Sequence, residues 1–311
     1  MTGTLSIPAV RPRRHGHDDA RRLGWLMMAP ALAMLAANSV FPLLYAVTVS
    51  FKNYQLLIPG VHRWVGFANY ARIFHESLFW SSLEVTLWFV AGVVFLQFPA
   101  GMALALLLNR LRRFQDLLVT LLLIPTIISS SVAAFQWTQL FNYRFGPVNY
   151  FLGLLHLGQP TWTADPSLAL PALIFVDCWQ WTPFMTLLLF AGLRSLPGSI
   201  VEAARMDGST TWQIVWRIYL PLLRPVIGIA LILRVLMTFK LFDIIYVLTA
   251  GGPGIATENL AFFTYVQGFR YFNLGYASAL AILQLIVVSL LAKALITLTR
   301  RSSLAGREAA T

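Results

Sequence analysis

Six long apolar stretches constrain this chain more than any other feature of its sequence. Each is long enough to cross the hydrocarbon core of a bilayer as a helix. They lie at about residues 23–49, 78–108, 117–140, 168–193, 222–249 and 274–298. Charged residues make up only 11% of the chain and hydrophobic residues 58%, whereas about 25% of a soluble domain is charged. The sequence therefore predicts an all-α membrane protein with six transmembrane helices.

The basic residues predict how these spans are oriented. Six spans place both ends on one side, so a transmembrane domain of residues 23–299 lies between polar tails at 1–22 and 300–311. With the tails in the cytoplasm, 15 basic residues fall inside and 5 outside. The inside group is Arg11, Arg13, Arg14, Arg21, Arg22, Arg110, Arg112, Arg113, Arg194, Arg205, Arg217, Arg224, Arg300, Arg301 and Arg307, and the outside group is Lys52, Arg63, Arg72, Arg144 and Arg270. Because Lys and Arg accumulate in cytoplasmic loops, both termini are expected in the cytoplasm.

A polar loop, residues 194–221, separates the fourth and fifth spans and lies on the same side as the termini. Its first half predicts a short helix that Ser199 caps and that Gly208 ends, because glycine tolerates the left-handed conformation beyond a helix. Thr210 and Gln213 then have the spacing of a capping box, which predicts a second short helix. The loop is expected to form two helices on the membrane surface.

The second of these helices has an apolar stripe. It is formed by residues at i, i+3, i+4 and i+7, namely Trp212, Val215, Trp216 and Tyr219. Pro221 lacks a backbone N–H and is expected to prevent the helix from running on regularly.

This loop resembles the EAA loop in the membrane subunits of binding-protein-dependent ABC importers. The matching residues are Glu202, Ala203, Ala204, Asp207, Gly208, Leu220 and Pro221. The chain is also similar to the carbohydrate-uptake branch of that family, the maltose-permease-like subunits, at residues 248–253 and 275–279. The resemblance covers nearly the whole chain after the N-terminal tail.

The resemblance implies a type I ABC importer permease fold in a multi-pass protein of the cytoplasmic (inner) membrane. It implies as partners two ATP-binding cassette subunits, a second permease that is similar but not identical, an extracellular or periplasmic solute-binding protein, and a sugar. The seven matching residues would couple the chain to an ATPase: Glu202 would meet basic groups of its cleft, and Gly208 would set the turn. A purely structural surface helix would explain the tryptophans but not the exposed Glu202 and Asp207.

Ionisable and polar residues inside the spans are candidates for a substrate pathway, because a charge in a bilayer must face protein or water. Asp177 and Gln180 lie one turn apart on the fourth span, and Arg234, Lys240 and Asp243 lie on the fifth. Lys240 and Asp243 can pair at i, i+3. An interhelical salt bridge that only holds helices together is an equal alternative for Lys240 and Asp243, and it is the favoured interpretation for Arg234 and Asp177.

Aromatic residues accompany the charges on the fifth span, namely Phe239, Phe242 and Tyr246. A sugar offers hydroxyl groups at its edge and C–H groups on its faces, so polar groups beside aromatic rings suit it. The resemblance implies that the pathway uses the fifth helix before the GGP turn, together with polar residues of the sixth, here Ser278 and Gln284. The candidate pathway residues are Asp177, Gln180, Phe239, Lys240, Phe242, Asp243, Tyr246, Ser278 and Gln284.

No motif for enzyme chemistry is found in the sequence. A GxxxxGK[ST] loop, an HExxH pair and a GxSxG elbow are all absent. Cys178 is the single cysteine, which excludes an intramolecular disulfide and a cysteine metal cluster. No catalytic residue, cofactor or metal site is expected. The chain has a net charge of +11, and its basic residues lie between and beside the apolar spans. This placement favours contact with membrane lipid over binding of nucleic acid.

The most favoured function is therefore a permease subunit of an ATP-driven importer for a sugar or oligosaccharide. One alternative is the same type of importer for glycerol phosphate or a polyol, since Lys240 or Arg234 could favour an anion. An ion-coupled secondary transporter is another alternative, although inverted repeats are not apparent. A non-transporting scaffold or sensor would not need buried charges.

Overall fold

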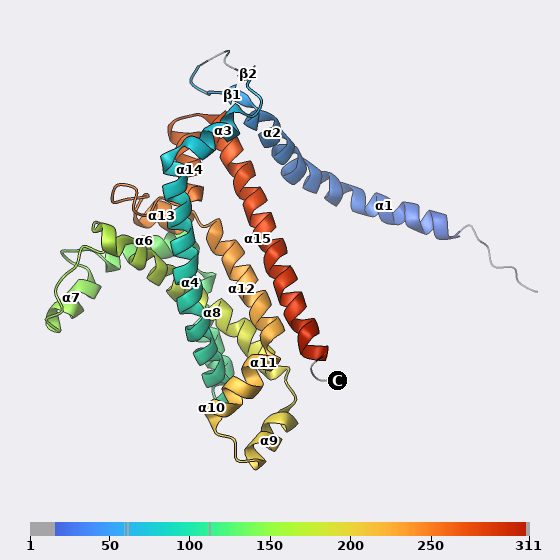
Figure 1. The fold of residues 1–311 in the computed structure, drawn as a ribbon, viewed down its shortest axis with the longest axis vertical. Helices are drawn as coiled ribbons and strands as arrows, with labels where there is room; N and C mark the ends of the chain where they lie inside the picture. Colours follow the sequence, from blue (N-terminus) through green and yellow to red (C-terminus); the bar gives the residue numbers. More distant parts are fainter. Residues whose placement is uncertain (1–15, 59, 61, 112, 309–311) are drawn as a thin grey trace, which may run out of the picture.

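The computed structural model describes residues 16–58, 60, 62–111 and 113–308 (Figure 1). Most of the polar N-terminal tail, residues 1–15, and the end of the C-terminal tail, residues 309–311, lie outside the described residues, as does Arg112. Within the described part, α1 begins at Gly16 and α15 continues to Glu308, so the helices extend into both expected tails.

Helices dominate the described chain, in agreement with the expected fold class. The α-helices are α1 (Gly16–Leu35), α2 (Phe41–Ser50), α3 (Ala68–His75), α4 (Ser77–Arg110), α5 (Gln115–Ile127), α6 (Ser130–Leu140), α7 (Pro147–Leu154), α8 (Pro166–Arg194), α9 (Gly198–Met206), α10 (Thr211–Ile214), α11 (Leu220–Leu222), α12 (Arg224–Phe239), α13 (Asp243–Leu248), α14 (Leu260–Tyr265) and α15 (Leu274–Glu308). Three π-helical turns join some of them, η1 (Ala36–Val40), η2 (Val215–Tyr219) and η3 (Val266–Arg270). A hairpin of β1 (Lys52–Tyr54) and β2 (His62–Trp64) is the one departure from an all-α chain in the described residues.

Four of the described helical segments are long and apolar enough to cross a membrane, and six spans result if each of two bent pairs counts as one. The four are residues 21–50, α4, α8 and 274–297. The first is mostly exposed: α1 projects away from the other helices, whereas α2 lies against α15 (Figure 1). The π-turn η1 interrupts this first helical segment just before α2, whose second residue is Pro42.

The third expected span, residues 117–140, is not one straight helix. It consists of α5 and α6, which meet at 91°. Pro125 removes one backbone N–H near the end of α5, and Ile128 is extended, with φ −73° and ψ 135°. The backbone therefore turns before α6 begins.

Three apolar clusters hold the bundle together. One joins α4, α6, α8, α13 and α14 around Phe89, Trp137 and Phe262. A second joins α3, α4, α12, α14 and α15 around Ile73, Phe239 and Tyr276, and the third packs α4, α8 and α12 against α11. The β1–β2 hairpin also contacts α15, where a Cβ at Gly275 would collide with the carbonyl oxygen of Lys52. The absence of a side chain at Gly275 therefore allows α15 and the hairpin to pack closely.

Candidate functional site

The loop between α8 and α12 begins with α9, which ends in a complete Schellman motif. Gly208 has φ +76°, as the sequence predicted. The N–H of Ser209 donates to the carbonyl of Ala204 at 2.9 Å, and that of Gly208 to the carbonyl of Arg205 at 3.1 Å. The prediction that Ser199 caps α9 is wrong: Pro197 is the N-cap residue and no side chain caps the helix. Ser199 lies inside the first turn instead.

The second loop helix continues from α10 through η2 to α11. Thr210 and Gln213 form the predicted capping box, with bonds of 3.3 Å and 2.7 Å. Pro221 cannot donate a backbone hydrogen bond, and the chain passes through the π-turn η2 just before it. The helix then bends by 71° into α12. Tyr219 and Leu220 pack on the cluster that joins α4, α8 and α12, so the elbow is fixed to the spans.

Helix α9 lies at one extreme end of the molecule, beyond the ends of α4 and α8 (Figure 1). Glu202, Ala203 and Asp207 are exposed on it, whereas Ala204 is buried. An exposed, rigidly terminated helix that carries two carboxylates is suited to contact with another protein. The structure thus brings the first five residues of the predicted coupling set onto α9 and its turn, and the last two, Leu220 and Pro221, onto the elbow.

The fifth expected span, residues 222–249, is broken in its second half. Helix α12 ends at Phe239, and α13 begins only at Asp243. The 16 residues of α12 extend for about 24 Å, which is less than the roughly 30 Å of a hydrocarbon core, so the break lies within the expected fifth span. Side-chain amides bond the carbonyls at the break: Asn259 donates to Leu241 at 2.6 Å, and Gln284 to Phe239 at 3.4 Å.

Irregular backbone occurs at membrane depth only where protein buries it or where it lines a water-filled cavity. The expected pairing of Lys240 with Asp243 is not found, because no ion pair joins them in the part of the chain that the structure describes. Both side chains are exposed in this single chain. Charges at this depth need protein or water around them, so this surface requires a partner chain or an aqueous passage.

An aromatic cluster adjoins the break. The rings of Phe242 and Tyr246 stack with centroids 5.2 Å apart, and Tyr265 lies 5.0 Å from Phe242. An open groove of about 400 Å³ borders the cluster and is lined by Phe242, Tyr265 and Ser278, among others. Tyr246 is 41% exposed. Rings that are partly exposed beside hydroxyl groups can stack on a ligand and bond its edge.

Two charged residues lie beside this cluster, Glu258 in the loop between α13 and α14 and Arg270 at the end of η3. The guanidinium of Arg270 lies 5.6 Å from the centre of the Phe262 ring. Burial raises the pKa of the Glu258 carboxyl above its usual range, and the charge of Arg270 opposes that shift.

Asp177 belongs to a separate, buried network between α4, α8 and α12. Arg234 forms an ion pair with Asp177 and donates to the Oε1 atom of Gln97 at 2.7 Å, while Gln97 donates to Asp177 at 2.9 Å. The guanidinium also lies 5.4 Å from the ring centre of Trp181. Both charged side chains are only 1% exposed. This geometry agrees with the alternative raised from the sequence, an interhelical salt bridge that holds the helices together.

Gln180, one turn from Asp177, forms a hydrogen bond with the backbone of another helix segment. Its amide nitrogen donates to the carbonyl of Ile128 at 2.8 Å, at the bend between α5 and α6. Gln180 and Gln284 therefore both satisfy carbonyls at helix breaks. The candidate pathway residues thus divide into one group around the α12–α13 break and another in the α4–α8–α12 interior.

Sequence reasoning missed Gln97, Asn259 and Tyr265. Gln97 is a lone polar side chain inside an apolar span, which is a usable signal. Asn259 caps α14 by accepting from the backbone N–H of Phe262, which is a local signal. Its bond to Leu241 and the contact of Tyr265 with Phe242 join residues that are distant in sequence and carry no such signal.

Similarity to known proteins identifies the family of this chain. Residues 97–302 match the profile of a family described as binding-protein-dependent transport system inner membrane component. The chain belongs to this family. It is therefore an inner membrane transport component, a permease of the ABC importer class, as the EAA-like loop predicted.

The permease is similar to named sugar transporters. It is 37% identical over 270 residues to the trehalose/maltose transport system permease protein MalF of Thermococcus litoralis, covering 86% of this chain and 90% of the relative. It is 34% identical to the trehalose transport system permease protein SugA of Mycobacterium tuberculosis, covering 88% of each chain.

A solved structure has the same fold as the permease. It is the crystal structure of a bacterial alginate ABC transporter in complex with an alginate pentasaccharide-bound periplasmic protein. The match has a TM-score of 0.81 and 22% identity, and covers 93% of this chain and 98% of the other. It supports the type I importer permease fold.

Proposed function

We propose that this permease imports a sugar or oligosaccharide by alternating access. The observation that carries the proposal is the broken fifth helix, where Lys240, Asp243 and Tyr246 are exposed at membrane depth beside stacked aromatic rings. Polar and aromatic groups together match the edge and the faces of a sugar ring. The trehalose and maltose permeases among the relatives support this substrate class.

The energy comes from other chains in this proposal. A soluble binding protein delivers the sugar from outside, and a second permease completes the passage. Two ATPase subunits bind the α9 helices, and Glu202 meets basic groups of the ATPase cleft. Because the elbow of Tyr219 and Leu220 is packed against α4, α8 and α12, movement of α9 is transmitted to the spans. Both termini and the loop lie in the cytoplasm, as the distribution of arginines favours.

An importer of glycerol phosphate or a polyol is the second candidate. The exposed ammonium group of Lys240 favours an anion. The aromatic cluster around Phe242 and Tyr246 favours a sugar face. Competition between unlabelled trehalose, maltose and glycerol 3-phosphate for uptake distinguishes the two candidates.

Replacing Tyr246 with alanine tests the pathway. Tyr246→Ala removes the partly exposed ring of the cluster, and we expect the KM for sugar uptake to rise by about tenfold, the loss of one aromatic contact. Tyr143→Ala is the matched control, because Tyr143 is 52% exposed on the loop after α6, away from this cluster. Sugar uptake by proteoliposomes of the whole transporter is the measurement. Equal KM values for the two variants and the wild type would remove Tyr246 from the pathway.

A further inference from the structure

A second cavity lies at the opposite end of the chain from the hairpin, between α4 and the loop helices. Its volume is about 200 Å³, and it is lined by Leu106, Asn109, Arg110, Arg205, Thr211, Ile214, Val215 and Tyr219. The two arginines come from distant parts of the sequence, the last turn of α4 and the helix α9. The fold therefore brings two exposed arginine side chains to one partly open cavity.

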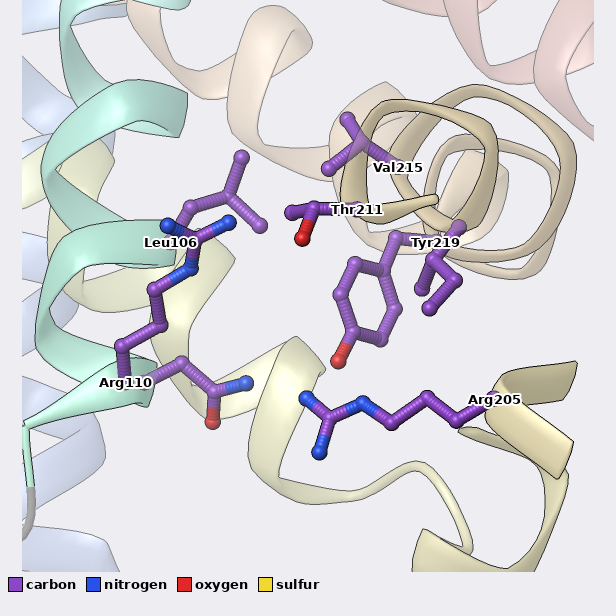
Figure 2. Close-up of a pocket in the computed structure, with 8 residues that line it drawn as sticks. Leu106, Arg110, Arg205, Thr211, Val215 and Tyr219 are labelled. Carbon is purple, nitrogen blue, oxygen red and sulfur yellow. The ribbon is translucent and has the colours of Figure 1, made fainter. Parts of the chain in front are cut away.

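The side chains form a polar lining around this space. Figure 2 shows Arg110 and Arg205 at its edges and the hydroxyl groups of Thr211 and Tyr219 facing it. Asn109 adds an amide. Each of these five side chains can donate a hydrogen bond.

The charge of the cavity is uncompensated within the described residues. Its lining contains two cations and no carboxylate, and no ion pair joins Arg110 or Arg205 to an acidic group in the part of the chain that the structure describes. Two like charges around one cavity repel each other unless an anion lies between them. Guanidinium groups bind phosphate oxygens in pairs of hydrogen bonds, which makes phosphate the favoured anion.

The surroundings indicate where the phosphate comes from. Trp212 and Trp216 lie on the same helical segment as Thr211 and Tyr219, are 70% and 55% exposed, and have ring centroids 5.4 Å apart. Exposed tryptophans favour the interface between lipid and water. A basic pocket at the cytoplasmic ends of membrane helices is suited to anionic lipid headgroups.

We infer that Arg110, Arg205, Thr211 and Tyr219 form a binding site for a phosphate-bearing anion, at the junction of α4 and the coupling loop. An anionic phospholipid headgroup is the expected source. Its phosphate links α4 directly to α9, so it stabilises the loop relative to the spans. This site does not depend on the substrate or on docking of the ATPase.

The test is a binding titration on the full-length chain purified in detergent. Phosphatidylglycerol is added to one series and inorganic phosphate to another, and apparent affinity is obtained from the rise in melting temperature. Arg110→Gln and Arg205→Gln are each expected to weaken phosphatidylglycerol binding by about tenfold, the loss of one charge-assisted contact. The matched controls, Arg113→Gln and Arg217→Gln, remove a charge from exposed arginines that do not line the cavity and are expected to bind like the wild type.

The remaining outcomes decide the source. Arginine-dependent stabilisation by both probes supports the site with free phosphate as a ligand, and stabilisation by phosphatidylglycerol alone assigns it to lipid. If all four variants respond as the wild type does, the site is overturned. It is also overturned if the two pocket variants bind both probes normally but lose the ATPase subunit. In that case the two arginines bind a carboxylate of a partner protein and not a phosphate. Circular dichroism of each variant checks that it is folded.

Discussion

Reversing the charge of Glu202 is expected to reduce ATP-driven sugar uptake by about a hundredfold or more, the cost of opposing a charge at a docking contact. Glu202 is exposed on α9, and no ion pair joins it to a basic group among the described residues. Glu202→Lys therefore leaves the fold of the chain intact and acts on the contact with the ATPase. Uptake by proteoliposomes and copurification of the ATPase subunit are the two measurements.

Asp116→Lys is the matched control for this charge reversal. Asp116 is an exposed carboxylate in the first turn of α5, the helix that follows α4. The control is expected to retain uptake and ATPase binding. Normal uptake by Glu202→Lys would disprove the coupling assignment of α9.

Removing one charge from the buried pair is expected to have the largest effect on stability. Asp177→Asn leaves the guanidinium of Arg234 without a counter-ion in a place where both side chains are only 1% exposed. Breaking a buried pair in this way costs about 3–5 kcal/mol in the free energy of unfolding. Melting temperature and yield of folded protein in detergent measure the loss.

The double variant Asp177→Asn with Arg234→Met tests whether the pair has only a structural role. Because it removes both charges, we expect it to recover much of the stability that the single variant loses. Its uptake is expected to resemble that of the wild type. Recovered stability together with a raised KM would instead place the pair in contact with the substrate.

The sequence allowed prediction of the features that depend on local pattern. The apolar stretches predicted α4, α8 and α15 because length and hydropathy alone determine a spanning helix. Thr210, Gln213 and Gly208 predicted the ends of the loop helices, since capping requires particular side chains at fixed spacing. The seven residues of the EAA-like loop predicted the family.

The break between α12 and α13 was beyond prediction from the sequence. Residues 239–243 contain neither glycine nor proline, and the carbonyls at the break are bonded by Asn259 and Gln284, which come from distant parts of the chain. Lys240 and Asp243 were expected to pair on a continuous helix, and the break removes that geometry. The partner of Asp177, Arg234, is 57 residues away in sequence, so spacing could not identify it.

Transport by the reconstituted complex tests the central claim most directly. The chain, its second permease, the ATPase subunits and the binding protein are placed in liposomes, and uptake of labelled trehalose or maltose is followed with and without ATP. We predict accumulation that requires both ATP and the ATPase subunits. Undiminished accumulation without the ATPase, driven by an ion gradient, would contradict the account.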